Sequence, residues 1–165
     1  MKDHLMLMLK YKAWADELFL SCLSELPHDV LLKEQSIVFG NILNTVNHVH
    51  RIDVIWQKQL LGVDHGFKTK TPSSPQTIEQ LIPQFLKINL WYQGFLSQSQ
   101  VSDLDQILQF RFLNGQEGAM SRAGILLHVI NHATYHRGHV ADMLYGAGCV
   151  PPVTDLPVFL ANYKV

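Results

Sequence analysis

Histidines are the side chains in this sequence with the clearest chemical potential, and the chain has nine of them in 165 residues. His132 and His136 are four residues apart in the segment SRAGILLHVINHATYHRGHV, whose apolar residues recur with the period of a helix. Side chains at positions i and i+4 of a helix have Cβ atoms about 5–6 Å apart. Two imidazoles at that spacing can share a metal ion at ~2.0–2.1 Å, so this segment indicates part of a metal site.

The spacing alone leaves the pair of ligands open. His128 and His132 have the same separation, and His139 lies near the same side of the helix. A single histidine on an apolar face is ordinarily a hydrogen-bonded core residue. Two neighbouring imidazoles without an ion are costly to bury, because each carries a donor and an acceptor that need partners.

A third ligand would come from another helix. In the segment NILNTVNHVHRIDVIW, His48 shares a face with Ile52 and Ile55 and is expected to point inward, whereas His50 is expected to be exposed. Positions 133 to 135 are Ala, Thr and Tyr, so the chain lacks the glutamate of an HExxH motif. Zincin-type protease chemistry is therefore disfavoured.

Four polar residues near these histidines are candidates to support a ligand or a substrate: Asn47, Asp53, Tyr135 and Arg137. Asp53 is five residues after His48 and is expected to be turned well away from it. Arg137 points about 100° away from its neighbour His136, where it would bind a substrate carboxylate or pair with an acid on another helix. The other residues of interest are expected in the core or an interface (Trp14, Trp56, Trp91) or on the surface (His4, His28, His65).

Long helices are expected to position these side chains. Apolar periodicity predicts helices over about residues 7–26, 39–61, 78–96 and 121–145, and one short last helix capped by Thr154 or Asp155. A short hairpin is predicted between residues 105 and 120, where apolar and polar residues alternate before two glycines. The expected inward stripes are Leu7, Tyr11, Trp14, Leu18, Cys22 and Leu26 on the first helix and Ile125, Val129, His132, His136, Val140 and Met143 on the fourth. The pattern predicts an all-α four-helix bundle that occupies residues 1–165 as one domain.

Composition excludes several classes of function. With 13 basic and 14 acidic residues the net charge is -1, which offers no basic surface for nucleic acid or for an anionic membrane. Lys68 and Lys70 lie in a Thr-, Ser- and Pro-rich stretch that is interpreted as a solvated loop. Two distant cysteines suggest no disulfide framework. Without a signal peptide or a long apolar run, the protein is expected to be cytoplasmic.

At its histidine segments the sequence resembles the DinB/YfiT-like family of metal-dependent helical bundles. The resemblance covers nearly the whole chain and includes YKAWADELF, NILNTVNHVHRIDVIW, NGQE, HVINHATYHRGHV and PPVTDLPVFL. It implies up-down-down-up connectivity, frequent dimerisation and a three-histidine metal site. Carried over by position, the ligands are His48, His132 and His136. Many relatives have glutamine after HRG, where this chain has His139.

An open three-histidine site suggests an enzyme. Three neutral imidazoles leave a coordination position free, and one Zn²⁺ or Ni²⁺ per chain suits such ligands. The leading hypothesis, chiefly from the resemblance, is a transferase in which the metal activates a low-molecular-weight thiol for attack on an electrophilic small molecule. The alternatives are a metal-dependent hydrolase, a non-catalytic metal-binding or dimerisation module of a stress response, a nucleic-acid protein suggested only by the family's name, and haem ligation.

Overall fold

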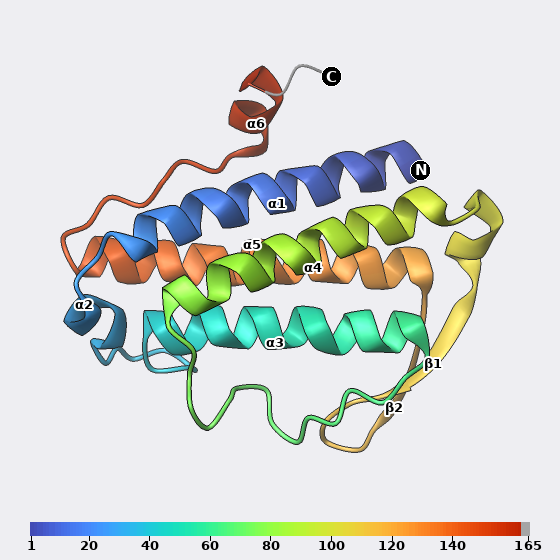
Figure 1. Ribbon diagram of the computed structural model, residues 1–165, viewed down its shortest axis with the longest axis horizontal. Helices are drawn as coiled ribbons and strands as arrows, with labels where there is room; N and C mark the ends of the chain where they lie inside the picture. Colours follow the sequence, from blue (N-terminus) through green and yellow to red (C-terminus); the bar gives the residue numbers. More distant parts are fainter. Residues whose placement is uncertain (163–165) are drawn as a thin grey trace.

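A computed structural model describes residues 1–162 and contains four long helices with short elements between them (Figure 1). The long helices are α1 (Lys2–Ser24), α3 (Ile42–Leu61), α4 (Ile78–Gln98) and α5 (Arg122–Gly146). The short elements are α2 (His28–Leu32), the 3₁₀ helix η1 (Val101–Asp105), strands β1 (Ile107–Arg111) and β2 (Glu117–Ser121), and α6 (Leu156–Asn162). None of the helices in this described part is long and apolar enough to cross a membrane.

The four long helices form a bundle with up-down-down-up connectivity. Helices α1 and α5 run in one direction, and α3 and α4 run in the other (Figure 1). Two successive helices can run the same way because the connection over residues 62–77 returns along the bundle before α4 begins. Helix α1 packs on α4 and α5, and α3 packs on α5 and α4. The predicted fold class is confirmed.

Helix boundaries follow from local capping. Asn41 accepts a hydrogen bond from a backbone N–H of the first turn, so α3 begins after this residue and not at the predicted position 39. Gly62 ends α3 in the left-handed region at φ 69°, as glycine does at many helix ends. Thr77 forms a capping box with Gln80 at the start of α4. Ser121 caps α5 by accepting from the backbone N–H of Gly124.

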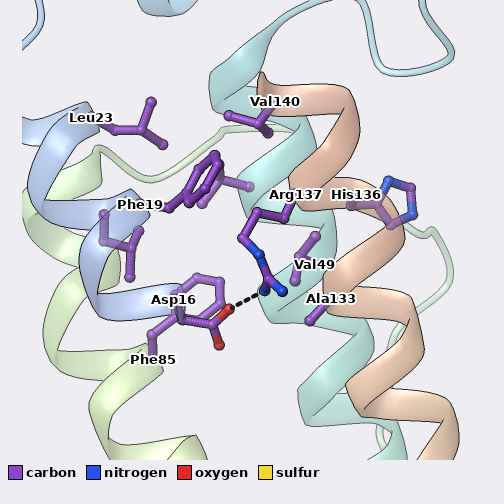
Figure 2. Close-up of a pocket in the computed structure, with 11 residues that line it drawn as sticks. Asp16, Phe19, Leu23, Val49, Phe85, Ala133, His136, Arg137 and Val140 are labelled. Atoms are coloured by element: carbon purple, nitrogen blue, oxygen red, sulfur yellow. Dashed lines mark ion pairs between the residues drawn. The ribbon is translucent and has the colours of Figure 1, made fainter. Parts of the chain in front are cut away.

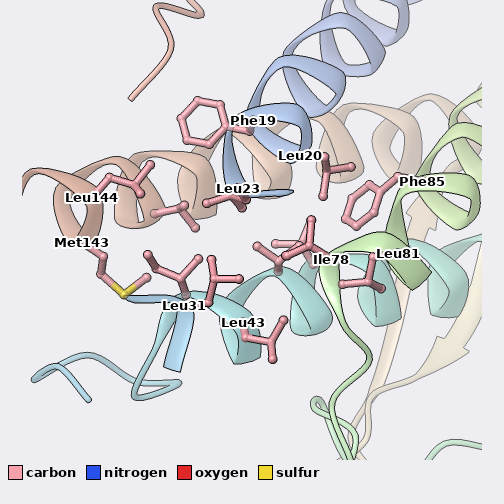
Figure 3. Packing of buried hydrophobic residues seen from close by; sticks show 14 of the residues in the cluster. Phe19, Leu20, Leu23, Leu31, Leu43, Ile78, Leu81, Phe85, Met143 and Leu144 are labelled. Atoms are coloured by element: carbon pink, nitrogen blue, oxygen red, sulfur yellow. The ribbon is translucent and has the colours of Figure 1, made fainter. Parts of the chain in front are cut away.

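Side chains from α1, α3, α4 and α5 fill the centre of the bundle. One cluster, shown in Figure 3, lies at the end of the bundle that α2 closes. A second cluster lies toward the hairpin and contains Trp56, Tyr92 and Leu126. Packing of these apolar side chains stabilises the fold by about 25 cal/mol for each Å² of apolar surface that it removes from water. The two clusters hold α3 and α5 side by side, and these are the helices that carry the histidines.

The predicted inward stripe of α1 is wrong. Of its members only Tyr11 is buried, and the core face runs instead through Leu5, Leu9 and Phe19. The same face includes two charged residues, Lys12 and Asp16, which are 1% and 7% exposed. Charged residues on the inner face interrupt the apolar pattern, so hydrophobic periodicity selects a face rotated away from the true one.

The predicted hairpin is confirmed. Strands β1 and β2 pair antiparallel, with Phe110 opposite Gly118. Phe110 is buried and packs edge-on against Trp56 of α3, with ring centroids 4.9 Å apart. A Cβ at position 118 would lie 2.7 Å from the Phe110 ring, so glycine is needed for this ring to fit. The hairpin is thereby attached to the bundle beside the histidine helices.

Candidate metal centre

The three predicted ligands converge between α3 and α5. His48 comes from α3, and His132 and His136 lie one turn apart on α5. One potential ligand atom from each residue lies within 4.8 Å of the others. The Nε2 atoms of His48 and His132 are 3.1 Å apart, close to the separation of two nitrogens on one ion at ~2.0–2.1 Å.

A hydrogen bond fixes the orientation of His48. Its Nδ1 lies 3.0 Å from the carbonyl oxygen of Lys70, which can only accept, so Nδ1 carries the proton. The unprotonated Nε2 then presents its lone pair to the Nε2 of His132, 3.1 Å away. A backbone carbonyl on the far nitrogen is the usual support of a metal-binding histidine. Phe39 stacks on the opposite side, with ring centroids 4.1 Å apart and planes 24° from parallel.

The loop that supplies this carbonyl is itself held to α3. Arg51, one turn of helix from His48, donates to the carbonyl oxygens of Thr69 at 3.2 Å and Thr71 at 2.9 Å. Its guanidinium also lies over the ring of Phe67, 4.6 Å from the centroid. The stretch interpreted as a solvated loop therefore has a structural role through its backbone, although the side chains of both lysines in it are exposed.

Burial keeps all three imidazoles neutral. It lowers the pKa of His132 to about 2 and that of His136 to about 4, and the neighbouring histidines add to both shifts. Burial also lowers the pKa of His48, against the opposing effect of its bond to the Lys70 carbonyl. At neutral pH each ring is in the form that binds a metal, so no proton has to be displaced from these rings.

The three residues fit a divalent ion. They present nitrogen donors that suit zinc, nickel and other borderline metals. The Nδ1 atoms of His132 and His136 are buried and find no hydrogen-bond partner within residues 1–162. Buried polar groups are ordinarily satisfied, so these rings have binding capacity that the described protein atoms leave unmet. The group of three thus has the composition, charge and spacing of an open metal site.

A cavity of about 500 Å³ lies beside the three histidines. Other histidines line it with them: His128, whose ring is edge-on to Trp56, and His139, next to Tyr135. His65 also reaches the cavity and is half-buried, so the expectation of a surface position is wrong for this residue. The remaining lining comes from α3, the hairpin and the loops on either side of α3: Val38, Phe39, Ile52, Ile55, Trp56, Gln59, Lys70, Phe110, Arg111, Phe112, Leu113, Asn114 and Gln116.

Arg137 points away from the metal centre, as Figure 2 shows. Its Nη1 lies 3.7 Å from Asp16 Oδ1 of α1, and its Nη2 donates to the hydroxyl of Tyr11 at 2.9 Å. That hydroxyl donates in turn to the carbonyl of Thr154 in the C-terminal segment. Of the two roles weighed for Arg137, the structure has the pairing with an acid on another helix. This pairing fixes the rotation of α5 and hence the direction of the adjacent His136.

Asp53 also belongs to the bundle interior and not to the metal centre. The Lys12 ammonium donates three hydrogen bonds of 2.8 Å, to Asp16, Asp53 and Asn89. Asn89 also donates to Asp16, and these side chains with Arg137 are called the buried ion cluster below. Burial raises the pKa of Asp53 to about 6, against the opposing charge of Lys12. The cluster joins α1, α3, α4 and α5 at one level of the bundle.

Two further predictions about α3 need correction or closer description. Asn47 donates to the carbonyl of Gln76 and accepts from its backbone N–H, so its side chain holds the start of α4. His50 was expected to be exposed but is half-buried against Phe85. Burial, with the charges of Lys12 and Arg51, lowers its pKa to about 4. His50 thus serves packing between α3 and α4.

Fold and site together define a class of protein: a helical bundle with three histidines grouped on two of its helices. A comparison with protein families matches residues 1–163 to the DinB family, and this chain belongs to that family. The chain is 30% identical to Protein DinB of Bacillus subtilis (strain 168), over 99% of this chain and 98% of that protein. A crystal structure of a DinB-like protein from Bacillus cereus ATCC 10987 has the same fold, with a TM-score of 0.64 and 20% identity over 87% of this chain and 91% of that chain.

Proposed function

We propose that this protein is a metal-dependent transferase that joins a low-molecular-weight thiol to an electrophilic small molecule, using one Zn²⁺ or Ni²⁺ per chain. The observation that supports it is the position of the three neutral histidines at the wall of a cavity of about 500 Å³. A purely structural metal site is ordinarily closed by four protein ligands. A non-catalytic metal-binding module has no need of a substrate-sized space beside its ion.

The proposed ligands are His48, His132 and His136. A divalent ion held by them would lower the pKa of a bound thiol or water. The chain's own residues supply the rest: the Lys70 carbonyl keeps the His48 ring oriented, and Phe39 and Trp56 contribute apolar rings to the cavity lining. An apolar lining favours the thiol over hydroxide as the attacking group, because a thiol with an apolar body gains more from contact with these rings.

The proposed reaction is balanced without a further reactant. The thiol loses its proton, its sulfur forms a bond to the electrophilic carbon, and the leaving group departs with the electrons of the bond that breaks. The proton neutralises the leaving group or passes to solvent. No oxidation or reduction occurs. Hydrolysis would use the same ligands with water as the attacking group, and a thioether product distinguishes the two reactions.

The first experiment measures metal content by mass spectrometry on protein purified without an affinity tag. We expect about one ion per chain in the wild type and in His4→Ala, and loss of the ion in His132→Ala. His4 is an exposed histidine outside the cavity and serves as the matched control. Failure to bind Zn²⁺ or Ni²⁺ even after reconstitution would overturn the proposed function.

The second experiment tests the reaction. Metal-loaded protein is incubated with a panel of thiols and electrophiles, and thioether formation is followed by mass spectrometry. We expect turnover that is lost after chelation and restored by the ion. Release of hydrolysis product without thioether would assign the hydrolase reaction instead. Stoichiometric metal with neither product would leave the metal-binding module as the function.

We further propose that the protein forms a homodimer through the outer face of α4. Ile82, Leu86 and Leu90 recur every four residues and are 38%, 61% and 58% exposed. They border a groove that continues to Trp14 of α1. Contiguous exposed apolar residues of this kind ordinarily mark a protein interface. Light scattering should give twice the monomer mass for the wild type and the monomer mass for Leu86→Asp, and a monomeric wild type would refute this interface.

A further inference from the structure

Part of the cavity lining is a continuous row of aromatic rings. Trp56 of α3 meets Phe110 of β1 edge-on at 4.9 Å, and Phe110 meets Phe112 edge-on at 5.0 Å. Phe112 is 47% exposed, so part of its ring has no protein neighbour. Phe39, which also lines the cavity, stacks on His48. A flat apolar ligand placed between these rings would bury exposed aromatic surface, which favours binding.

The charged residues of the cavity all have one sign. Among the residues that line it within the described part of the chain, none is Asp or Glu, whereas Lys70 and Arg111 are cations. Arg111 is paired with Glu117, 3.1 Å away across the hairpin, and both side chains are largely exposed. Lys70 has no carboxylate within ion-pair distance in residues 1–162. A bound divalent ion would add to the positive potential, so the cavity repels cations and attracts anions.

We propose that the electrophile accepted by this site is an aromatic or similarly flat apolar molecule that carries a carboxylate or another anionic group. Its apolar body lies against Trp56, Phe110 and Phe112, and its anionic group lies near the Lys70 ammonium. That this ligand is an electrophile rests on the proposed function. The selection of a flat anion is a property of the cavity alone and is testable without turnover.

The test uses three unreactive probes of nearly equal size: 4-methylbenzoate, 4-methylbenzamide and 4-methylbenzylammonium. Binding to the metal-loaded and the metal-free protein is measured by calorimetry. We expect the benzoate to bind about fivefold more tightly than the benzamide, the order expected for one solvent-exposed charge pair, and the benzylammonium to bind most weakly. The benzoate preference should persist in the metal-free protein, since the Lys70 ammonium contributes to the selection of the anion independently of the metal ion.

Substitutions separate the two parts of the proposal. Lys70→Gln removes the ammonium but keeps the backbone carbonyl that orients His48, so the metal content should stay unchanged. The affinities for benzoate and benzamide should become nearly equal in this variant. Lys68→Gln is the matched control, because this lysine is exposed in the same loop and does not line the cavity. Phe112→Ala should weaken benzoate and benzamide by the same factor, whereas Leu127→Ala, on an exposed position of α5 outside the cavity, should weaken neither.

Two results would overturn the inference. Equal affinity for the three probes, or tightest binding of the benzylammonium, would show that the cavity does not select anions. A benzoate preference that survives in Lys70→Gln and disappears on removal of the ion would assign the selection to the metal. Because binding is measured with and without metal, these outcomes are distinct from a failure of the proposed transferase, which would appear as missing metal or missing thioether.

Discussion

Replacing Lys12 by methionine should destabilise the protein more than any ordinary change in its apolar core of similar volume. The Lys12 side chain is 1% exposed, and its ammonium lies 2.8 Å from Asp16 and from Asp53. Methionine fills a similar volume but removes three hydrogen bonds, leaves Asp53 without a cation, and leaves Asp16 with only the Arg137 guanidinium 3.7 Å away. Removing one partner of a buried ion pair costs about 3–5 kcal/mol. We expect a loss of stability in that range at neutral pH.

The cost should depend on pH with a definite sign. The pKa of Asp53 is raised by burial to about 6 and held down by the Lys12 ammonium. Without the ammonium this carboxyl takes up a proton at higher pH, and a neutral carboxyl is cheaper to bury. The folded variant then binds more protons than the unfolded chain, so its stability rises as pH falls. The difference between wild type and Lys12→Met should therefore shrink as pH falls from neutral toward about 6, and should remain at the smaller value below that pH.

Urea unfolding followed by far-ultraviolet circular dichroism measures both effects, at neutral pH and at about pH 5. Lys87→Met, on an exposed position of α4, is the control and should change stability by less than ~0.5 kcal/mol. The double variant Lys12→Met with Asp53→Asn should recover part of the loss. A loss below ~1 kcal/mol, or a loss equal at both pH values, would refute the view that Lys12 neutralises buried charge.

Three further predictions concern the unliganded fold, the hairpin and the loop at the metal centre. The metal-free protein should lose stability as pH falls from 6.5 to about 4. The pKa of the metal-centre histidines is lowered in the folded state, so the unfolded chain binds protons first, and the raised pKa of Asp53 opposes this by one proton only. Urea unfolding that shows constant or rising stability over this pH range would contradict the prediction. Gly118→Ala places a Cβ 2.7 Å from a ring of β1 and should cost about 1–3 kcal/mol in thermal unfolding, whereas Gly94→Ala, with nothing within 4 Å, should cost nothing. Arg51→Gln releases the loop whose carbonyl orients the α3 histidine. Measured in competition with a chelator, Zn²⁺ affinity should be about tenfold weaker in this variant and unchanged in Arg111→Gln. Equal Zn²⁺ affinities in the two variants would contradict this role of the loop.

The long helices and the closeness of His132 to His136 were predictable from sequence because both rest on short-range pattern. Apolar periodicity predicts the long helices, and i,i+4 spacing places His132 beside His136. The partner on α3 depends on how two helices pack, which spacing does not determine. For His48 the resemblance to a family provided what periodicity could not.

Each position that the sequence did not predict correctly has its own physical cause. The inner face of α1 carries Lys12 and Asp16, so a search for apolar residues alone rotates the helix. His50 and His65 were expected on the surface because histidine itself gives no sign of burial; the neighbouring ring of Phe85 and the cavity wall decide their exposure. The support of His48 by the Lys70 carbonyl leaves no side-chain signal, because any residue at position 70 has that carbonyl.

The sequence separation of the metal-centre residues determines when an ion can act. His48 and His132 are 84 residues apart, and by the relation used for disulfides a bond that closes such a loop removes about 4–5 kcal/mol of chain entropy from the unfolded state. Helix α5 follows α1, α3 and α4 along the chain, so during synthesis the three ligands exist together only after those helices have been made. During synthesis, an ion that needs all three histidines therefore cannot guide the folding of the first helices. It would act as a cross-link between α3 and α5 in the folded bundle and would slow its unfolding.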